Sequence, residues 1–235
     1  MLRAVIFDMD GVLIDSQPYH FAVEDKMCRE MGIDVSLEES HSFVGMAGAK
    51  VWGYLKNKFA LQESIDELLA FENKARTAYF SSLENLQPIP GVVELLNVLK
   101  QHNIKTALAS SSSAEVIEIF LSKMGLKDFF QQITNGDAVE KGKPDPDIFL
   151  HTARALGENP SDCLVIEDSA NGVKAAKLAG MKCIGFRNAN SGDQDLSLAD
   201  MVIDDFRKIN VAIIASLYSQ ITTARGGDNL TSGHE

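Results

Sequence analysis

The sequence is poor in cysteine, in long apolar runs and in positive charge. Its three cysteines, Cys28, Cys163 and Cys183, are widely spaced and form neither a zinc-binding pattern nor a Cys-x-x-Cys motif. We expect reduced cysteines in the core of a cytoplasmic protein. No apolar run approaches the ~18 residues of a membrane span. The first apolar run begins within a few residues of Met1, so we expect no signal peptide.

Positive charge is scarce, because 22 Lys and Arg face 33 Asp and Glu and give a formal net charge of −11. No long basic run offsets this charge, which argues against binding to nucleic acid or to an anionic membrane. It does not exclude an anionic small molecule, because a bound cation can reverse the local field. With 235 residues, 45% of them hydrophobic, the chain is long enough to bury a full core.

Short apolar runs alternate with helical patterns over most of the chain. The first strand is expected to end at Phe7, and further strands are expected at 105–109, 132–134, 163–166, 182–186 and 201–203. Helices are expected at 92–101, 114–124, 146–156, 170–179 and about 207–219. This alternation predicts an α/β fold with a doubly wound, Rossmann-like parallel sheet.

Residues 16–86 have a different character, because their apolar positions recur at helical spacing and no convincing strand interrupts them. We expect a small helical domain over 16–86, inserted after the first strand of an α/β core made of 1–15 and 87–223. A polar tail over 224–235 is expected to be mobile. A helical domain in this place could close over the strand ends as a lid.

Two aspartates, Asp8 and Asp10, follow the first apolar run, and Gly11 permits a sharp turn beside them. Open α/β sheets bind ligands at the carboxyl ends of their strands, and carboxylates are costly to bury without partners. The pair therefore indicates a metal site, a phosphoryl acceptor, or both. An ordinary strand-ending turn is the alternative.

Three further segments place functional groups at predicted strand ends or before helices. They are Ser110 and Ser111 after the strand at 105–109, Lys143 in a Gly-Lys-Pro turn, and Glu167 and Asp168 after the strand at 163–166. Each segment alone is typical of a helix cap or a surface turn. Together they are expected to converge on Asp8, because parallel strands end at the same edge of a sheet.

These segments together resemble the four motifs of the haloacid dehalogenase-like superfamily. The helical insertion after the first strand is similar to the cap of its β-phosphoglucomutase-like phosphatase branch. The resemblance implies that Asp8 is a nucleophile that forms an aspartyl-phosphate. It also implies that Asp10 protonates the leaving alcohol and then activates water.

The resemblance further implies a Mg²⁺ ion held by Asp8, the backbone carbonyl of Asp10 and Asp168, with Glu167 in or near its coordination shell. Ser110 and Ser111 would then bind phosphoryl oxygens, and Lys143 would offset negative charge. A divalent cation is expected because the four acids outnumber the one lysine before any phosphate binds.

His20 lies in a segment, Asp15-Ser16-x-Pro18-Tyr19-His20, that resembles the hinge of the mutase branch, where a histidine pairs with the general acid. A surface histidine near a helix start is the alternative. Mutases of this branch carry a basic Lys-Gly-x-Ser-Arg motif in the cap, whereas this chain has no cation from Val44 to Gly48. The distal anion site that a mutase needs is therefore not evident.

The sequence thus predicts a Mg²⁺-dependent phosphatase that acts on a small phosphorylated metabolite of the sugar phosphate type and is a monomer. β-Phosphoglucomutase is the enzymatic alternative. A phosphate-accepting signalling module is a more distant one, disfavoured because such a module needs a long-lived aspartyl-phosphate and no general acid.

Overall fold

The structure is a computed structural model that describes residues 1–43 and 48–219. Within this part of the chain, six parallel strands form one sheet in the order β3-β2-β1-β4-β5-β6. The strands are β1 (Ala4–Phe7), β2 (Lys105–Ala109), β3 (Gln132–Thr134), β4 (Cys163–Glu167), β5 (Lys182–Phe186) and β6 (Met201–Ile203). The predicted parallel α/β sheet is confirmed.

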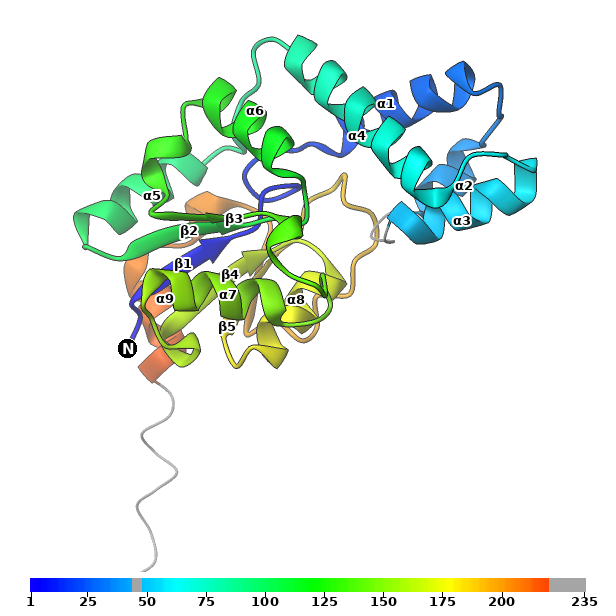
Figure 1. Cartoon of the computed structure of the whole chain (residues 1–235). Helices are drawn as coiled ribbons and strands as arrows, with labels where there is room; N and C mark the ends of the chain where they lie inside the picture. Colours follow the sequence, from blue (N-terminus) through cyan, green and yellow to red (C-terminus); the bar gives the residue numbers. More distant parts are fainter. Residues whose placement is uncertain (44–47, 220–235) are drawn as a thin grey trace, which may run out of the picture.

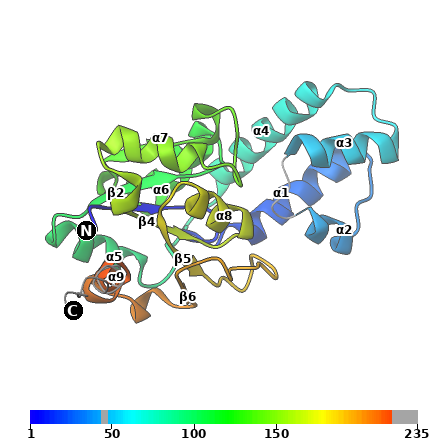
Figure 2. The same ribbon diagram turned by 90° about the horizontal axis from the view of Figure 1, so that it is seen from below.

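Helices cover both faces of this sheet: α5 (Val92–Gln101), α6 (Ala114–Met124) and α9 (Val211–Ser219) on one face, α7 (Asp147–Leu156) and α8 (Ala170–Leu178) on the other. Figure 2 shows α7 on one side of the strands and α5 and α9 on the opposite side. Side chains along β1 alternate accordingly, with Val5 and Phe7 in one apolar cluster and Ala4 and Ile6 in the other. Central strands buried on both faces explain the continuous apolar runs.

Helices α1 (Gln17–Glu30), α2 (Leu37–Ser42), α3 (Gly48–Phe59) and α4 (Ile65–Ser82) lie to one side of the sheet (Figure 1). The described residues between 16 and 86 contain no strand. Helix α4 packs on α6 of the core, where the rings of Phe80 and Phe120 lie 4.9 Å apart. In 1–43 and 48–219, no helix has the length and apolar character needed to cross a membrane. The predicted tail at 224–235 lies outside the described residues.

The last helix is shorter than predicted. It begins at Val211, and Phe206–Lys208 form a separate 3-10 turn instead of its first turn. The carboxylate of Asp205 accepts a hydrogen bond from the backbone N–H of Arg207, and the Asn210 side chain accepts one from the N–H of Ile213. Two successive side-chain acceptors therefore start two short helical elements where the apolar pattern indicated one.

Gly91 permits a close approach between the start of α5 and the segment before α9. Its φ is +91°, and a Cβ there would lie 2.8 Å from Phe206 Cβ. Gly157 also has a positive φ, of +70°, but a Cβ there would meet nothing within 4 Å. Gly157→Ala should cost about 1–2 kcal/mol of unfolding free energy for the left-handed backbone alone. Gly91→Ala should cost more, measured by urea denaturation, whereas equal losses would contradict this close packing.

Candidate active site

The predicted residues meet at the carboxyl ends of β2, β1 and β4. Pairing of β1 with both neighbours places Phe7 beside Leu108 and Ile166, so the segments that follow leave the sheet at one edge. A cavity of about 170 Å³ opens there, and its lining includes Asp8, Asp10, Ser111, Lys143, Glu167 and Asp168. The convergence expected from the sequence is therefore present in the fold.

Lys143 is the central contact of this cavity. Its Nζ donates to Asp8 Oδ1 at 2.5 Å, to Glu167 Oε1 at 2.6 Å and to the carbonyl oxygen of Ala109 at 3.2 Å. Burial lowers the pKa of Lys143, but the charges and hydrogen bonds of Asp8 and Glu167 raise it further, and the net shift is upward. The side chain is therefore a fixed ammonium between two carboxylates.

Negative charge at the site exceeds what Lys143 can neutralise. Burial raises the pKa of Asp8 well above its usual value, and the charges of Glu167, Asp168 and Asp10 raise it further against the opposing effect of Lys143. Burial and the charge of Glu167 raise the pKa of Asp168 to about 8. Carboxylates that resist ionisation in this way indicate that a positive charge belongs beside them.

The donor set fits a hard cation. Asp8 and Asp168 supply carboxylate oxygens, and the backbone around Gly11 lies so close to Asp168 that a Cβ on Gly11 would fall 1.8 Å from Asp168 Oδ2. Only glycine fits at this position. Because Gly11 has no side chain, the turn after Asp10 can pack directly against Asp168. Across 1–43 and 48–219, no three His, Cys, Asp or Glu side chains form a ready-made ligand group. Two carboxylates, a backbone carbonyl and waters are nevertheless typical of a Mg²⁺ site.

Asp10 is held by three hydrogen bonds. Its Oδ1 accepts from Ser16 Oγ at 2.6 Å and lies 3.1 Å from His20 Nε2, and its Oδ2 accepts from Ser112 Oγ at 2.8 Å. Burial raises the pKa of Asp10, but the hydrogen bond and charge of His20 and the two serine hydroxyls outweigh it and hold the pKa well below its usual range. The structure thus brings His20 to Asp10, as the hinge resemblance implies.

The serines around the site differ in what they contact. Ser16 is the residue before α1, but its hydroxyl makes no capping hydrogen bond and donates to Asp10 instead. Ser110 is fully buried and its Oγ accepts from the N–H of Ser112, whereas Ser111 lines the cavity. Ser112 was not predicted as a site residue, although it belongs to the same serine run. The phosphate-binding roles of Ser110 and Ser111 stay predictions.

Both carboxylate oxygens of Glu167 are occupied by donors. Oε1 accepts from Lys143, and Oε2 accepts from the N–H and the hydroxyl of Ser169, each at 2.9 Å. A Cβ on Gly172 would lie 1.8 Å from Glu167 Oε1, so the start of α8 closes over this carboxylate. Glu167 therefore lies in a fixed position beside Lys143.

The loop after β5 contributes contacts that the motif analysis missed. Ser191 Oγ donates to Asp168 Oδ2. Asn188 Nδ2 donates to the carbonyl oxygen of Gly11 at 3.0 Å, and Asn190 Nδ2 donates to Asp15 Oδ2 at 2.5 Å. These residues match no motif, and their only signal in the sequence is a run of small polar residues after a predicted strand.

A parallel α/β sheet with acids at the carboxyl ends of its strands is the arrangement found here, and comparison with known proteins identifies the family. The model of the haloacid dehalogenase-like hydrolases matches residues 5–186. The chain belongs to this family.

Individual relatives cover nearly the whole chain. YhcW of Bacillus subtilis, provisionally named a phosphatase, is 32% identical over 91% of this chain and 96% of its own length. The β-phosphoglucomutase of the same organism is 32% identical over 93% of this chain and 96% of its own length. A phosphorylated carbohydrates phosphatase of Thermotoga maritima is 33% identical over 78% of this chain and 84% of its own length. The crystal structure of β-phosphoglucomutase from Clostridium difficile superposes with a TM-score of 0.78 and 28% identity, covering 93% of this chain and 98% of that one.

The raised pKa of Asp168 predicts how stability depends on pH without a metal. Asp168 keeps its proton up to about pH 8 in the folded state, against an ordinary value of 3.8. The folded protein therefore binds more protons than the unfolded chain between these values, so the free energy of unfolding should fall as pH rises through this range. We expect this fall in urea denaturation with chelator present, and a smaller fall for Asp168→Asn.

The exposed carboxylate of Asp195 is the matched control, because its pKa is lowered by the Ser197 hydrogen bonds. Asp195→Asn should keep the wild-type pH dependence across this range. A wild-type stability that rises with pH under these conditions would contradict the charge balance described for the site.

Proposed function

We propose that the protein is a Mg²⁺-dependent phosphatase that hydrolyses a small phosphorylated metabolite of the sugar phosphate type through an aspartyl-phosphate on Asp8. The observation that carries this proposal is the pairing of Asp8 with the buried ammonium of Lys143, beside a second aspartate held separately. The family membership and relatives named as phosphatases support it.

In the first step, a carboxylate oxygen of Asp8 attacks phosphorus, and the bond from phosphorus to the leaving alcohol oxygen breaks. Lys143 keeps Asp8 oriented and offsets the charge of the incoming phosphate. Glu167 orients Lys143, because its two oxygens are taken by Lys143 and Ser169. This assigns Glu167 a positioning role, with direct metal coordination as the alternative.

Asp10 acts as the general acid and then as the general base. It donates a proton to the leaving oxygen in the first step. In the second step it accepts a proton from the water that attacks phosphorus, while the bond from phosphorus to the Asp8 oxygen breaks and the Asp8 carboxylate and inorganic phosphate are released. Its three hydrogen bonds favour the ionised form, so Asp10 gains its proton more readily when a donor withdraws. Ser16 and His20 come from the start of the helical segment, whereas Ser112 comes from the core. Movement of the helices relative to the sheet would therefore change the hydrogen bonds of the Asp10 carboxylate and, with them, its pKa.

Asp8, Asp168 and the backbone carbonyl of Asp10 would hold Mg²⁺. When bound, the ion supplies positive charge that stabilises the phosphoryl oxygens as charge develops on them. We further propose that the helical segment over 16–86 is a cap that excludes water from the strand ends. Ser111 donates to a phosphoryl oxygen from the cavity wall.

β-Phosphoglucomutase is the second candidate, favoured by the Bacillus subtilis relative of that name. A mutase must bind a bisphosphate in two orientations. The region 44–47, where mutases carry basic residues, lies outside the described residues, and its sequence holds no Lys or Arg. Comparing phosphate release with bisphosphate-dependent isomerisation of a hexose phosphate separates the two candidates.

Substitution of the two aspartates tests the division of roles. Asp8→Asn should abolish turnover of p-nitrophenyl phosphate, because the amide cannot form the phosphoenzyme. Asp10→Asn should lower kcat by about 10²–10⁴-fold and accumulate phosphoenzyme, because proton transfer is lost. Asp195→Asn is the control and should match wild type. Near-normal turnover by Asp8→Asn would exclude covalent catalysis at this residue.

Metal dependence has a test that does not rely on activity alone. Chelator should abolish turnover and Mg²⁺ should restore it, and Mg²⁺ should raise the melting temperature of the chelator-treated protein. Ser191 holds Asp168, so Ser191→Ala should raise the Mg²⁺ concentration needed for half of that stabilisation by about 10–100-fold. Ser197→Ala, at an exposed position of the same segment, should not change it. Full activity in excess chelator would refute the metal assignment.

A further inference from the structure

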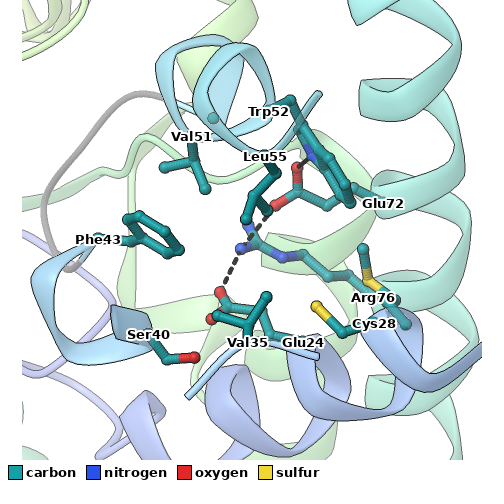
Figure 3. Close-up of a pocket in the computed structure, with 12 residues that line it drawn as sticks. Glu24, Cys28, Val35, Ser40, Phe43, Val51, Trp52, Leu55, Glu72 and Arg76 are labelled. Atoms are coloured by element: carbon teal, nitrogen blue, oxygen red, sulfur yellow. Dashed lines mark hydrogen bonds and ion pairs between the residues drawn. The ribbon is translucent and has the colours of Figure 1, made fainter. Parts of the chain in front are cut away.

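A second cavity, of about 120 Å³, lies within the helical segment between α1, α3 and α4 (Figure 3). Its apolar wall includes Phe43, Val51 and Leu55, and its polar groups include Glu24, Glu72 and Arg76. An apolar pocket with a few convergent polar groups is typical of a small-molecule site.

The polar groups are incompletely paired. Arg76 Nη2 lies 2.7 Å from Glu72 Oε1 and 3.0 Å from Glu24 Oε1, and Trp52 Nε1 donates to Glu72 Oε2 at 2.6 Å. Arg76 Nε is buried and has no hydrogen-bond partner among the described residues. A buried N–H group without an acceptor is costly, so this side of the cavity favours a ligand that brings an oxygen.

The cavity begins close to the residues that hold Asp10. The ring of His20 on α1 packs edge-on against Phe80 on α4, with centroids 5.2 Å apart. Glu24 and Arg76, which pair with each other, lie one helical turn further along the same two helices. One turn advances ~5.4 Å, which is within the length of a phosphorylated carbon chain.

The charge of this cavity is unsuited to a second anionic group. Its described lining holds two acids, Glu24 and Glu72, against one base, Arg76. Two other cavities show the same excess of acidic over basic residues. The described lining of the one between α4 and α6 holds Glu115 and Asp137 against Lys74. The described lining of the one beside α1 holds Asp193 and no basic residue. Whichever of these cavities a leaving group enters, a second phosphate or carboxylate would meet net repulsion.

We infer that the substrate is a phosphate monoester of a neutral polyol or sugar without a second phosphate or carboxylate, and that its distal hydroxyl groups bind in the cavity between α1, α3 and α4. One hydroxyl oxygen accepts from Arg76 Nε, and a hydroxyl group donates to Glu24. The volume accommodates roughly four water-sized groups at ~30 Å³ each, or about two hydroxylated carbons. This inference rests on the proposed function and narrows its substrate class.

The first test measures kcat/KM of the wild-type protein with Mg²⁺. The substrates are pentose and hexose monophosphates, phosphoglycolate, a hexose bisphosphate, and p-nitrophenyl phosphate as an ester without hydroxyl groups. The best neutral monophosphate should exceed both phosphoglycolate and the bisphosphate by about tenfold or more. An equal or better value for either doubly anionic substrate overturns the inference.

The second test removes the donor but keeps the charge. Arg76→Lys lacks the Nε–H group and should lower kcat/KM for the best monophosphate about tenfold, while p-nitrophenyl phosphate changes less than about twofold. Glu30→Gln, at an exposed position on the same helix as Glu24, is the control and should leave both values unchanged. Equal losses for both substrates would show a merely structural role for Arg76 and overturn the inference.

A second variant leaves the ion pairs intact, so it tests the inference even if Arg76→Lys does not fold. Ser40→Ala alters the cavity wall without touching the Glu24–Arg76–Glu72 contacts, and it should likewise reduce turnover of the monophosphate selectively. Failure of the proposed function has a different signature. It would appear as wild-type protein that cannot hydrolyse p-nitrophenyl phosphate, or as Asp8→Asn that still can, whereas a preference for doubly anionic substrates overturns this inference alone.

Discussion

The buried contact of Lys143 with Asp8 and Glu167 is the interaction on which the site depends. Among the described lining residues of this cavity, one ammonium contacts two carboxylates with Asp168 beside them, which leaves a surplus of negative charge among largely buried side chains. Burial, together with that surplus, raises the pKa of Asp8 and Asp168, so a cation at the strand ends would stabilise the site. The same lysine orients Asp8 for its proposed attack on phosphorus, so charge balance and chemistry follow from one contact.

Much of this arrangement could be predicted from the sequence, because the site is built at the ends of parallel strands. Apolar runs located the strands to within a residue or two, and topology alone required that the groups after β1, β2 and β4 meet. The contact of His20 with Asp10 was expected from the resemblance of the hinge segment, whereas the contact of Ser16 with Asp10 was not predicted. Local pattern and global fold agree here, as in most natural sequences.

The contacts that could not be predicted come from loops and from competing side-chain acceptors. Ser191 reaches Asp168 from a loop whose path no periodicity specifies, and Ser112 reaches Asp10 although its neighbours fit the motif equally well. Phe206–Lys208 form a separate early turn because the Asp205 carboxylate accepts a hydrogen bond from the backbone N–H of Arg207. The polar cavity around Arg76 was missed because Glu24 lies on α1 and Glu72 and Arg76 lie on α4, and nothing in the sequence indicates that these two helices bring them together.

In the proposed mechanism, Asp8 carries the phosphoryl group between the two steps. An aspartyl-phosphate is an acyl phosphate, which borohydride reduces so that the aspartate becomes homoserine. The most direct measurement is to quench the protein during turnover, reduce it with borohydride, and locate homoserine by peptide mass spectrometry. We expect homoserine at position 8 during turnover and none there without substrate. Unmodified Asp8 during active turnover, or homoserine at another aspartate, would contradict it.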